Sequence, residues 1–324
     1  MFKNKKILIT GGTGSFGGAM LDFLIKKKLK EIIIYSRDEM KQWFLKEKLK
    51  DHQNIKFVIG DVRDLDRLRY AVKGCDYVIH AAATKIVPTA EKNPEECIKT
   101  NIIGGLNIIK ASLDNKVKKV IALSTDKASS PINLYGATKL CSDKMFTSQY
   151  YEKTYTKFSV VRYGNVLGSR GSIIPHFLSI KNSGIFPLTH KDMTRFFLSL
   201  EDAVKFVANC FGLMKGGEIF IKKLPSVSIK DLISKIHPHP KIKIIGLREG
   251  EKIHEQMIGT DDALYTVEFK DHYEILPDLK LKKIKLANGN NVKNGFFYSS
   301  NNTTKISSNY LKKEILKIEK NLKL

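Results

Sequence analysis

Short apolar runs alternate along the first half of the chain with segments whose apolar residues recur every three or four positions. Residues 5–10, 31–35, 56–62, 76–83, 120–123 and 158–168 each predict a buried strand. The intervening segments are typical of amphipathic helices, including one over residues 92–115 and one that begins near Tyr135. This alternation predicts an α/β fold, a Rossmann-type doubly wound parallel sheet.

The pattern loosens after Gly168 and then partly returns. LEDAVKFVANCF predicts a helix, GGEIFI a strand, and IKDLISKI a helix capped by Ser228. KIKIIG predicts another strand, and one late helix is expected over residues 311–323. We therefore expect a Rossmann domain at residues 1–168, with 196–222 returning to it, and a smaller substrate-binding region made of 169–195 and 223–324.

A glycine-rich turn separates the first predicted strand from the first helix. Gly11, Gly14 and Gly17 are spaced G-x-x-G-x-x-G. Glycines in this context let the backbone approach a pyrophosphate at the helix N-terminus, although a plain tight turn has the same pattern. The expected dinucleotide contacts are Gly11, Thr13, Gly14, Ser15, Phe16 and Gly17.

Residues at the ends of the next strands indicate which dinucleotide the protein binds. Ser36 and Arg37 follow the second strand, where an Arg accommodates the phosphate of NADP; Asp38 beside them leaves NAD open. Asp61 and Val62 end the third strand, and Ala81 and Ala82 follow the fourth. We expect these residues to face the same cofactor, with NADP favoured.

The stretch from Val120 to Asp143 contains the candidate chemistry. Thr125, Asp126 and Lys127 follow a predicted strand, where open α/β sheets place their active sites. Tyr135 and Lys139 lie one helical turn apart. We expect the Lys139 ammonium to lower the pKa of the Tyr135 phenol, so that it can act as a base. Such a pair also arises by chance on helices.

Composition narrows the function classes. No apolar run approaches the roughly 20 residues that span a bilayer, and the short apolar start is no signal peptide, so we expect a cytoplasmic protein without a membrane partner. The four cysteines are far apart, and the His237-Pro238 and His239-Pro240 pairs favour an ordered turn, so no metal site is expected. The net charge of +23 comes from dispersed lysines, which favours a solvated basic surface over nucleic-acid binding.

These residues resemble a known family. GGTGSFG with a downstream YxxxK is typical of extended short-chain dehydrogenases/reductases. YSRDEMKQ, AEKNPEECIKTNIIG, ALSTDKASSPINLYGATK, VVRYGNVLGSRGS, MTRFF and GEKIHEQMI are similar to the inverting UDP-N-acetylglucosamine 4,6-dehydratases of pseudaminic acid biosynthesis. Retaining dehydratases usually have Glu where this chain has Lys127, and membrane-bound relatives have Met where it has Tyr135. The chain departs from the family at Ile86, often His, and at Glu249, often Pro.

The resemblance implies a lyase that binds NADP and a UDP-sugar. Tyr135, with Lys139, would serve oxidation at carbon 4. A neutral Lys127 would remove the carbon-5 proton, a protonated Asp126 would give its proton to the hydroxyl that leaves carbon 6, and hydride would return to carbon 6. Thr125 would bind the carbon-4 oxygen. The implied substrate contacts are Lys85, Asn165, Arg195, Arg248 and Glu251, with Lys85 also near the cofactor; each Arg has a surface salt bridge as its alternative. A homo-oligomer, a hexamer, is also implied. An epimerase, a retaining dehydratase and a non-catalytic NADP-binding protein remain alternatives.

Overall fold

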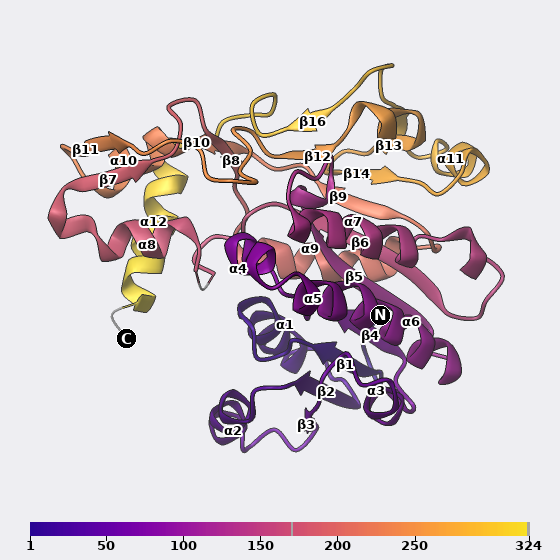
Figure 1. The fold of residues 1–324 in the computed structure, drawn as a ribbon. Coiled ribbons are helices and arrows are strands. Elements are labelled where there is room, and N and C mark those ends of the chain that lie inside the picture. The colour runs from indigo at the N-terminus through magenta and orange to yellow at the C-terminus, as the bar shows by residue number, and fades with distance from the viewer. Residues whose placement is uncertain (170, 323–324) are drawn as a thin grey trace.

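A computed structural model describes residues 1–169 and 171–322. Within these residues, ten strands form one sheet in the order β15-β13-β14-β9-β6-β5-β4-β1-β2-β3. The seven strands from β9 to β3 are parallel, and β14, β13 and β15 extend the sheet in antiparallel fashion. Figure 1 shows helices on both sides of this sheet and a second lobe at one end of it. The predicted fold class is confirmed.

The bounds of the elements follow from the short apolar runs and the capped helices between them. The parallel strands are β1 (Lys6–Thr10), β2 (Glu31–Ser36), β3 (Ile55–Ile59), β4 (Tyr77–His80), β5 (Lys119–Thr125), β6 (Lys157–Tyr163) and β9 (Ile219–Lys222); the antiparallel ones are β13 (Thr266–Glu268), β14 (His272–Ile275) and β15 (Asn290–Asn291). The helices around them are α1 (Ser15–Ile25), α2 (Glu39–Lys48), α3 (Leu65–Val72), α4 (Val87–Lys92), α5 (Pro94–Ile98), α6 (Gly104–Asp114), α7 (Leu134–Phe146), α9 (Leu200–Leu213) and α11 (Leu279–Lys285).

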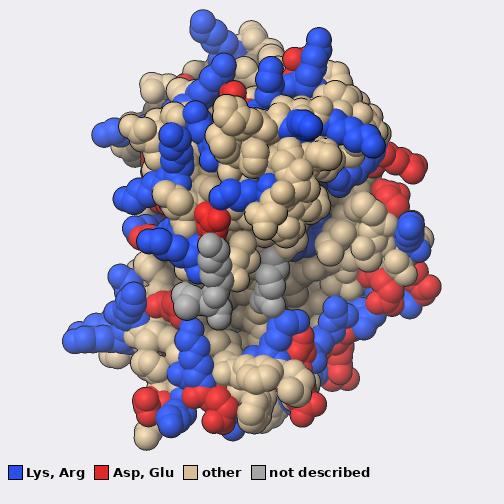
Figure 2. All heavy atoms as spheres, turned by 90° about the vertical axis from the view of Figure 1, so that its left-hand side faces the viewer, with Lys and Arg blue, Asp and Glu red and all other residues tan. Residues whose placement is uncertain are grey.

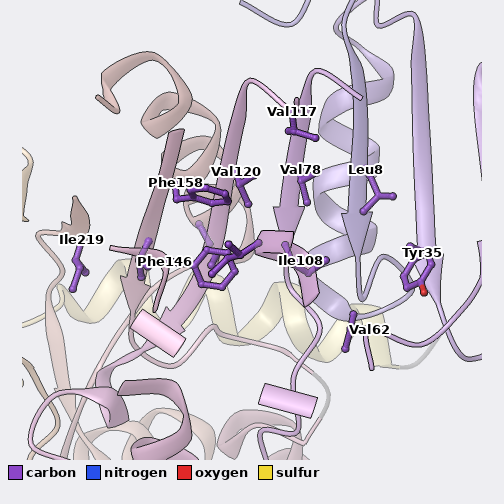
Figure 3. Close-up of a cluster of buried hydrophobic side chains, with 14 of the residues drawn as sticks. Leu8, Tyr35, Val62, Val78, Ile108, Val117, Val120, Phe146, Phe158 and Ile219 are labelled. Atoms are coloured by element: carbon purple, nitrogen blue, oxygen red, sulfur yellow. The ribbon is translucent and has the colours of Figure 1, made fainter. Parts of the chain in front are cut away.

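The parallel strands are apolar on both faces because helices cover both. On β1, Ile7 and Ile9 pack with residues of α1 and α9 on one face. Leu8, between them, points to the other face and packs with residues of α3, α6 and α7. Figure 3 shows this second core, in which Phe146 and Ile108 lie against the sheet. The period of two along each strand thus builds two cores from one run of apolar residues.

The second lobe has an apolar core of its own. It contains α8 (Ile173–Ser179), β7 (Ile185–Leu188), α10 (Ile229–Ile236), β11 (Lys241–Ile244) and α12 (Ser308–Leu322). Short strand pairs adjoin it and the sheet: β8 (Thr194–Phe196) with β10 (Ser226–Ser228), and β12 (Gln256–Ile258) with β16 (Tyr298–Ser299). β13 to β15 join the large sheet, so part of the region expected to bind substrate extends the Rossmann sheet instead.

Two elements differ from the prediction. The strand expected over residues 158–168 stops at Tyr163, and the chain then enters a loop beside the cleft described below. The helix expected over 92–115 is interrupted by a π-helical turn, Lys99–Ile103. There the buried Asn101 side chain accepts a hydrogen bond from the Thr84 backbone N–H and donates one to its carbonyl, each 2.9 Å long. A widened turn at such a position is common near functional sites.

A buried ion pair ties the sheet to α7 next to the site. The Arg162 guanidinium on β6 lies 3.0 Å from the Asp143 carboxylate on α7, and both side chains are almost wholly buried. Ser124 also donates to Asp143, and Arg162 donates to the Met257 carbonyl at 2.7 Å. Arg162 therefore connects the sheet, α7 and β12.

We predict that Asp143→Ala lowers the free energy of unfolding by about 3–5 kcal/mol, because it removes the buried counter-charge of the Arg162 guanidinium and leaves only the more exposed Asp262, 4.0 Å away. Denaturant titration measures the change. Asp66→Ala removes one of the two exposed carboxylates paired with Arg69 and should change stability by less than about 1 kcal/mol. Adding Arg162→Met to Asp143→Ala should restore part of the loss; no recovery would contradict this account.

Candidate active site

The carboxyl ends of the parallel strands open into one cleft of about 920 Å³, which the second lobe also lines. Loops after parallel strands meet at the same sheet edge, so residues far apart in sequence converge there. All the predicted site residues except Asp126 line this cleft: Gly11, Thr13, Gly14, Ser15, Phe16, Gly17, Ser36, Arg37, Asp61, Val62, Ala81, Ala82, Lys85, Thr125, Lys127, Tyr135, Lys139, Asn165, Arg195, Arg248 and Glu251.

The glycine turn between β1 and α1 has no room for side chains on its inner side. Gly11 has a φ of +64°, and a Cβ on Gly17 would lie 2.5 Å from the Gly12 Cα. The Gly14 N–H donates to the Gly11 carbonyl, which closes the turn at the start of α1. The turn leaves the N-terminus of α1 open to the cleft, a cradle that fits the pyrophosphate of a dinucleotide.

The end of β2 carries the three residues expected to bear on the choice between NADP and NAD. Asp38 caps α2, because its carboxylate accepts a hydrogen bond from the Lys41 backbone N–H at 2.9 Å. Ser36 accepts a hydrogen bond from the Thr13 hydroxyl at 3.1 Å, beside the glycine turn. Arg37 is more than half exposed, with its guanidinium 3.6 Å from Asp61. Ser36, Arg37 and Asp38 all line the cleft, and Asp38 also caps α2.

Lys127 is clamped between two carboxylates. Its ammonium lies 3.1 Å from Asp126 Oδ1 and 2.9 Å from Glu255 Oε1. Burial alone would lower the pKa of Lys127, but the charges of Asp126 and Glu255 outweigh burial and raise it. The two carboxylates therefore favour the charged form of Lys127, against the expectation that desolvation makes it neutral, and its role as a base stays a prediction.

Asp126 lies behind the wall of the cleft. Its side chain is 1% exposed, and Oδ1 accepts hydrogen bonds from the Thr125 hydroxyl and from Lys127. Burial, and then the negative charge of Glu255, raise the pKa of Asp126. These causes favour the protonated form, in the direction that an acid requires. Any proton from Asp126 reaches the cleft through Thr125 or Lys127.

Tyr135 and Lys139 stand together on α7, whose cap is Asn133: its side chain accepts from the Gly136 N–H at 2.8 Å. Burial raises the pKa of Tyr135 to about 12, and the effects that oppose it come from Lys127 and Thr125. The pKa of Lys139 is itself lowered by burial. The prediction that Lys139 lowers the pKa of Tyr135 stays a prediction; Lys127 is a cation whose charge opposes the effect of burial on this phenol.

The predicted substrate residues come from four separate segments of the chain. Arg195 on β8 is almost buried, and its guanidinium donates to the Thr194 and Ile253 carbonyls and lies 3.5 Å from Glu251. Arg248 is exposed at the rim, and its backbone N–H donates to Glu251. Asn165 follows β6, and Lys85 follows β4. The cleft brings these residues together; their roles stay predictions.

Sequence reasoning missed two residues of the cluster. Glu255 lines the cleft with a side chain 3% exposed and joins Lys127 to Arg195, whose Nε lies 3.7 Å away. Lys252 donates to the Ser129 carbonyl at 2.6 Å and so holds this segment against the β5–α7 loop. Both belong to GEKIHEQMI, a motif quoted for the family resemblance. Its second Glu, four residues after Glu251, was the available signal.

A glycine-cradled Rossmann turn, a Tyr and Lys on one helix turn, and an acid–base cluster after the fifth strand define the class of extended short-chain dehydrogenases/reductases. Within that class, residues 7–277 match the family described as polysaccharide biosynthesis protein, and the chain belongs to it.

The similar proteins include two named nucleotide-sugar enzymes. The chain is 51% identical to the UDP-N-acetylglucosamine 4,6-dehydratase (inverting) of Campylobacter jejuni, over 98% of each chain. It is 40% identical to the UDP-glucose 4-epimerase of Rickettsia bellii, over 98% of this chain and 97% of that protein. The structure of Pen from Bacillus thuringiensis superposes with a TM-score of 0.90 at 38% identity, covering 98% and 99% of the two chains. The predicted resemblance and the prediction of an enzyme are confirmed.

We predict that Gly17→Ala weakens dinucleotide binding by at least about tenfold, because the new methyl group would force the turn away from Gly12. Gly18→Ala is the matched control, since a Cβ there meets nothing within 4 Å in the same helix. Isothermal titration calorimetry with NADP and with NAD measures both variants. Equal affinities for the two variants would show that the turn does not form the cradle.

Proposed function

We propose that this protein is a UDP-N-acetylglucosamine 4,6-dehydratase that inverts carbon 5. The observation that carries this proposal is Lys127, held at the cleft wall between two carboxylates and on the same side as Tyr135. The 51% identity with a protein named for this reaction supports it. A hydro-lyase of this kind needs a base and an acid beside carbons 5 and 6, and the cluster provides both.

The roles of the residues follow from the chemistry of the sugar. The hydrogen on carbon 5 becomes acidic only after carbon 4 is a ketone, so Tyr135 takes the carbon-4 hydroxyl proton first, with Thr125 beside that oxygen. Lys127 then removes the carbon-5 proton. It acts in its neutral form, after its own proton has moved to a neighbouring carboxylate. The Asp126 proton passes to the leaving hydroxyl through Thr125 or Lys127, which contact it at 3.0 and 3.1 Å.

The diphosphate end of the substrate needs cations. Arg195 and Arg248 are placed to bind it, because guanidinium groups donate in a fork that matches phosphate oxygens. Lys85, Asn165 and Glu251 complete the proposed substrate contacts along the same cleft. Glu251 keeps the Arg195 side chain oriented through its contact at 3.5 Å.

We propose NADP as the cofactor, held by the glycine turn and by Ser36 and Arg37. The end of β2 presents the Ser36 hydroxyl and the Arg37 guanidinium to the cleft, and the Asp38 carboxylate beside them caps α2. Asp61, Val62, Ala81 and Ala82 line the same part of the cleft. NADP would supply the hydride acceptor for carbon 4 and the hydride that returns to carbon 6, and it emerges unchanged.

Arg37→Ala should weaken NADP binding far more than NAD binding, because only NADP carries a 2′-phosphate for the guanidinium to meet. Comparing the two dissociation constants by calorimetry measures this. Arg67→Ala, which removes another largely exposed Arg, is the control and should change neither. A loss of equal size for both cofactors would contradict the assignment.

A UDP-sugar 4-epimerase is the second candidate, favoured by the 40% identity with a protein of that name. Both reactions begin with oxidation at carbon 4, so Tyr135 and the cofactor residues do not separate them. The acid–base cluster at Lys127 does, because an epimerase removes no proton from carbon 5 and loses no water. The product therefore decides between the two.

We expect purified protein to convert UDP-N-acetylglucosamine to UDP-2-acetamido-2,6-dideoxy-β-L-arabino-hexos-4-ulose. In deuterated water the early product should carry deuterium at carbon 5, and its ring-proton couplings in NMR should show the L-arabino arrangement. The spectra are taken early, since 4-keto sugars exchange at carbon 5 in solution. Only D-xylo product would exclude inversion, and a product that keeps its 6-hydroxyl would favour the epimerase.

Some finer expectations remain part of this proposal: a role in pseudaminic acid biosynthesis, a homo-hexamer and a cytoplasmic location. No helix among the described residues has the length and apolar character needed to cross a membrane. Figure 2 shows Lys and Arg scattered over the face it presents, with Asp and Glu between them. This distribution fits a basic surface that attracts an anionic sugar nucleotide better than a continuous nucleic-acid track.

A further inference from the structure

Glu255 has two cations within 4 Å, Lys127 and Arg195, whereas Asp126 has Lys127. The Glu255 side chain is 3% exposed; Oε1 lies 2.9 Å from the Lys127 ammonium and 3.7 Å from Arg195 Nε. Lys252 adds a third positive charge nearby. The backbone N–H of Glu255 donates to the Ser300 hydroxyl at 3.0 Å, which fixes its position at the start of β12.

Asp126 has the opposite surroundings. It is more deeply buried, contacts one cation, Lys127, at 3.1 Å, and has the negative charge of Glu255 nearby. Its Oδ2 is buried without a hydrogen-bond partner, as is Oε2 of Glu255. Lys127 carries one positive charge and so can neutralise one of the two carboxylates. Lys252 lies near both carboxylates, whereas Arg195 contacts Glu255 and favours its ionised form, so a proton on the cluster goes to Asp126.

We propose that Glu255 is a positioning residue that serves as the permanent counter-ion of Lys127 and thereby leaves Asp126 to carry the proton that the dehydration uses. This inference rests on the proposed dehydratase function and adds to it the residue that sets the charge of the acid–base pair. Glu255 need not touch the sugar. It also joins the pair to Arg195, the proposed diphosphate ligand, through one carboxylate oxygen.

The charge of Glu255 shifts the pH profile of kcat in one direction. The negative charge of Glu255 stabilises the protonated forms of both Asp126 and Lys127, so it raises the pH at which each loses its proton. The reaction needs one proton on this pair, so kcat should follow a bell whose two limbs report the two proton losses. Removing the charge of Glu255 lowers both values and moves the whole bell toward acid.

The test compares kcat against pH for the wild type, Glu255→Gln and Glu255→Asp. Glu255→Gln keeps the size of the side chain and should shift both limbs to lower pH by roughly one to three units. Glu255→Asp keeps the charge and should hold the bell in place, with a lower maximum. Glu268→Gln, which removes a partly exposed carboxylate paired with Lys223, is the control and should leave the bell unchanged.

A purely structural role for Glu255 would lower kcat in Glu255→Gln without moving the limbs, and that result, in protein that melts at the wild-type temperature, would overturn the proposal. An equal shift of the limbs in Glu255→Asp would also overturn it.

A ¹³C NMR titration of aspartate-labelled protein, with Asp126→Asn to assign the signal, follows the Asp126 carboxyl without turnover. Its transition should fall at lower pH in Glu255→Gln, and an unmoved transition would also overturn the proposal. Absence of UDP-N-acetylglucosamine turnover in the wild type would instead refute the proposed function alone.

Discussion

A single lysine ammonium between two buried carboxylates organises this molecule. Asp126 comes at the end of β5 and Glu255 at the start of β12, so the Lys127 bridge joins the Rossmann sheet to a segment more than a hundred residues later. The Asn133 amide and the Lys252 ammonium make two more bonds between the same parts, to the Gly250 and Ser129 carbonyls. Charges buried this deeply are costly unless they are paired. Each of the two segments therefore holds its position only while the other segment supplies the opposite charge.

The same burial explains why the site departs from simple pKa expectations. Burial raises the pKa of the Tyr135 phenol and of the Asp126 carboxyl, while it lowers that of Lys139. Lys127 goes the other way because the two carboxylates outweigh burial. Neighbouring groups thus differ in proton affinity within one cluster, and such separation is what lets one site supply both an acid and a base.

Much of the fold could be read from local pattern. Apolar runs separated by amphipathic segments predicted the order of strands and helices through β6, and the glycine spacing predicted the turn after β1. The bounds of a helix could not be predicted where a single side-chain contact decides them. Asn101 bonds to Thr84 and widens its helix, an effect that no periodicity reports. The three antiparallel strands that extend the sheet are two to four residues long, too short for a pattern.

The sequence by itself determined which residues follow each strand and therefore meet at one edge of the sheet. Parallel strands bring their carboxyl ends to that edge whatever the loops contain. The sequence therefore placed Thr125, Lys127 and Tyr135 in one cleft. Tertiary structure alone decided the charge state and partners of these groups. Asp38 acts as a helix cap, and the charges of Asp126 and Glu255 together outweigh the burial of Lys127. The physical reason is that proton affinity depends on burial and on charges within a few ångströms, which come from segments distant in the chain.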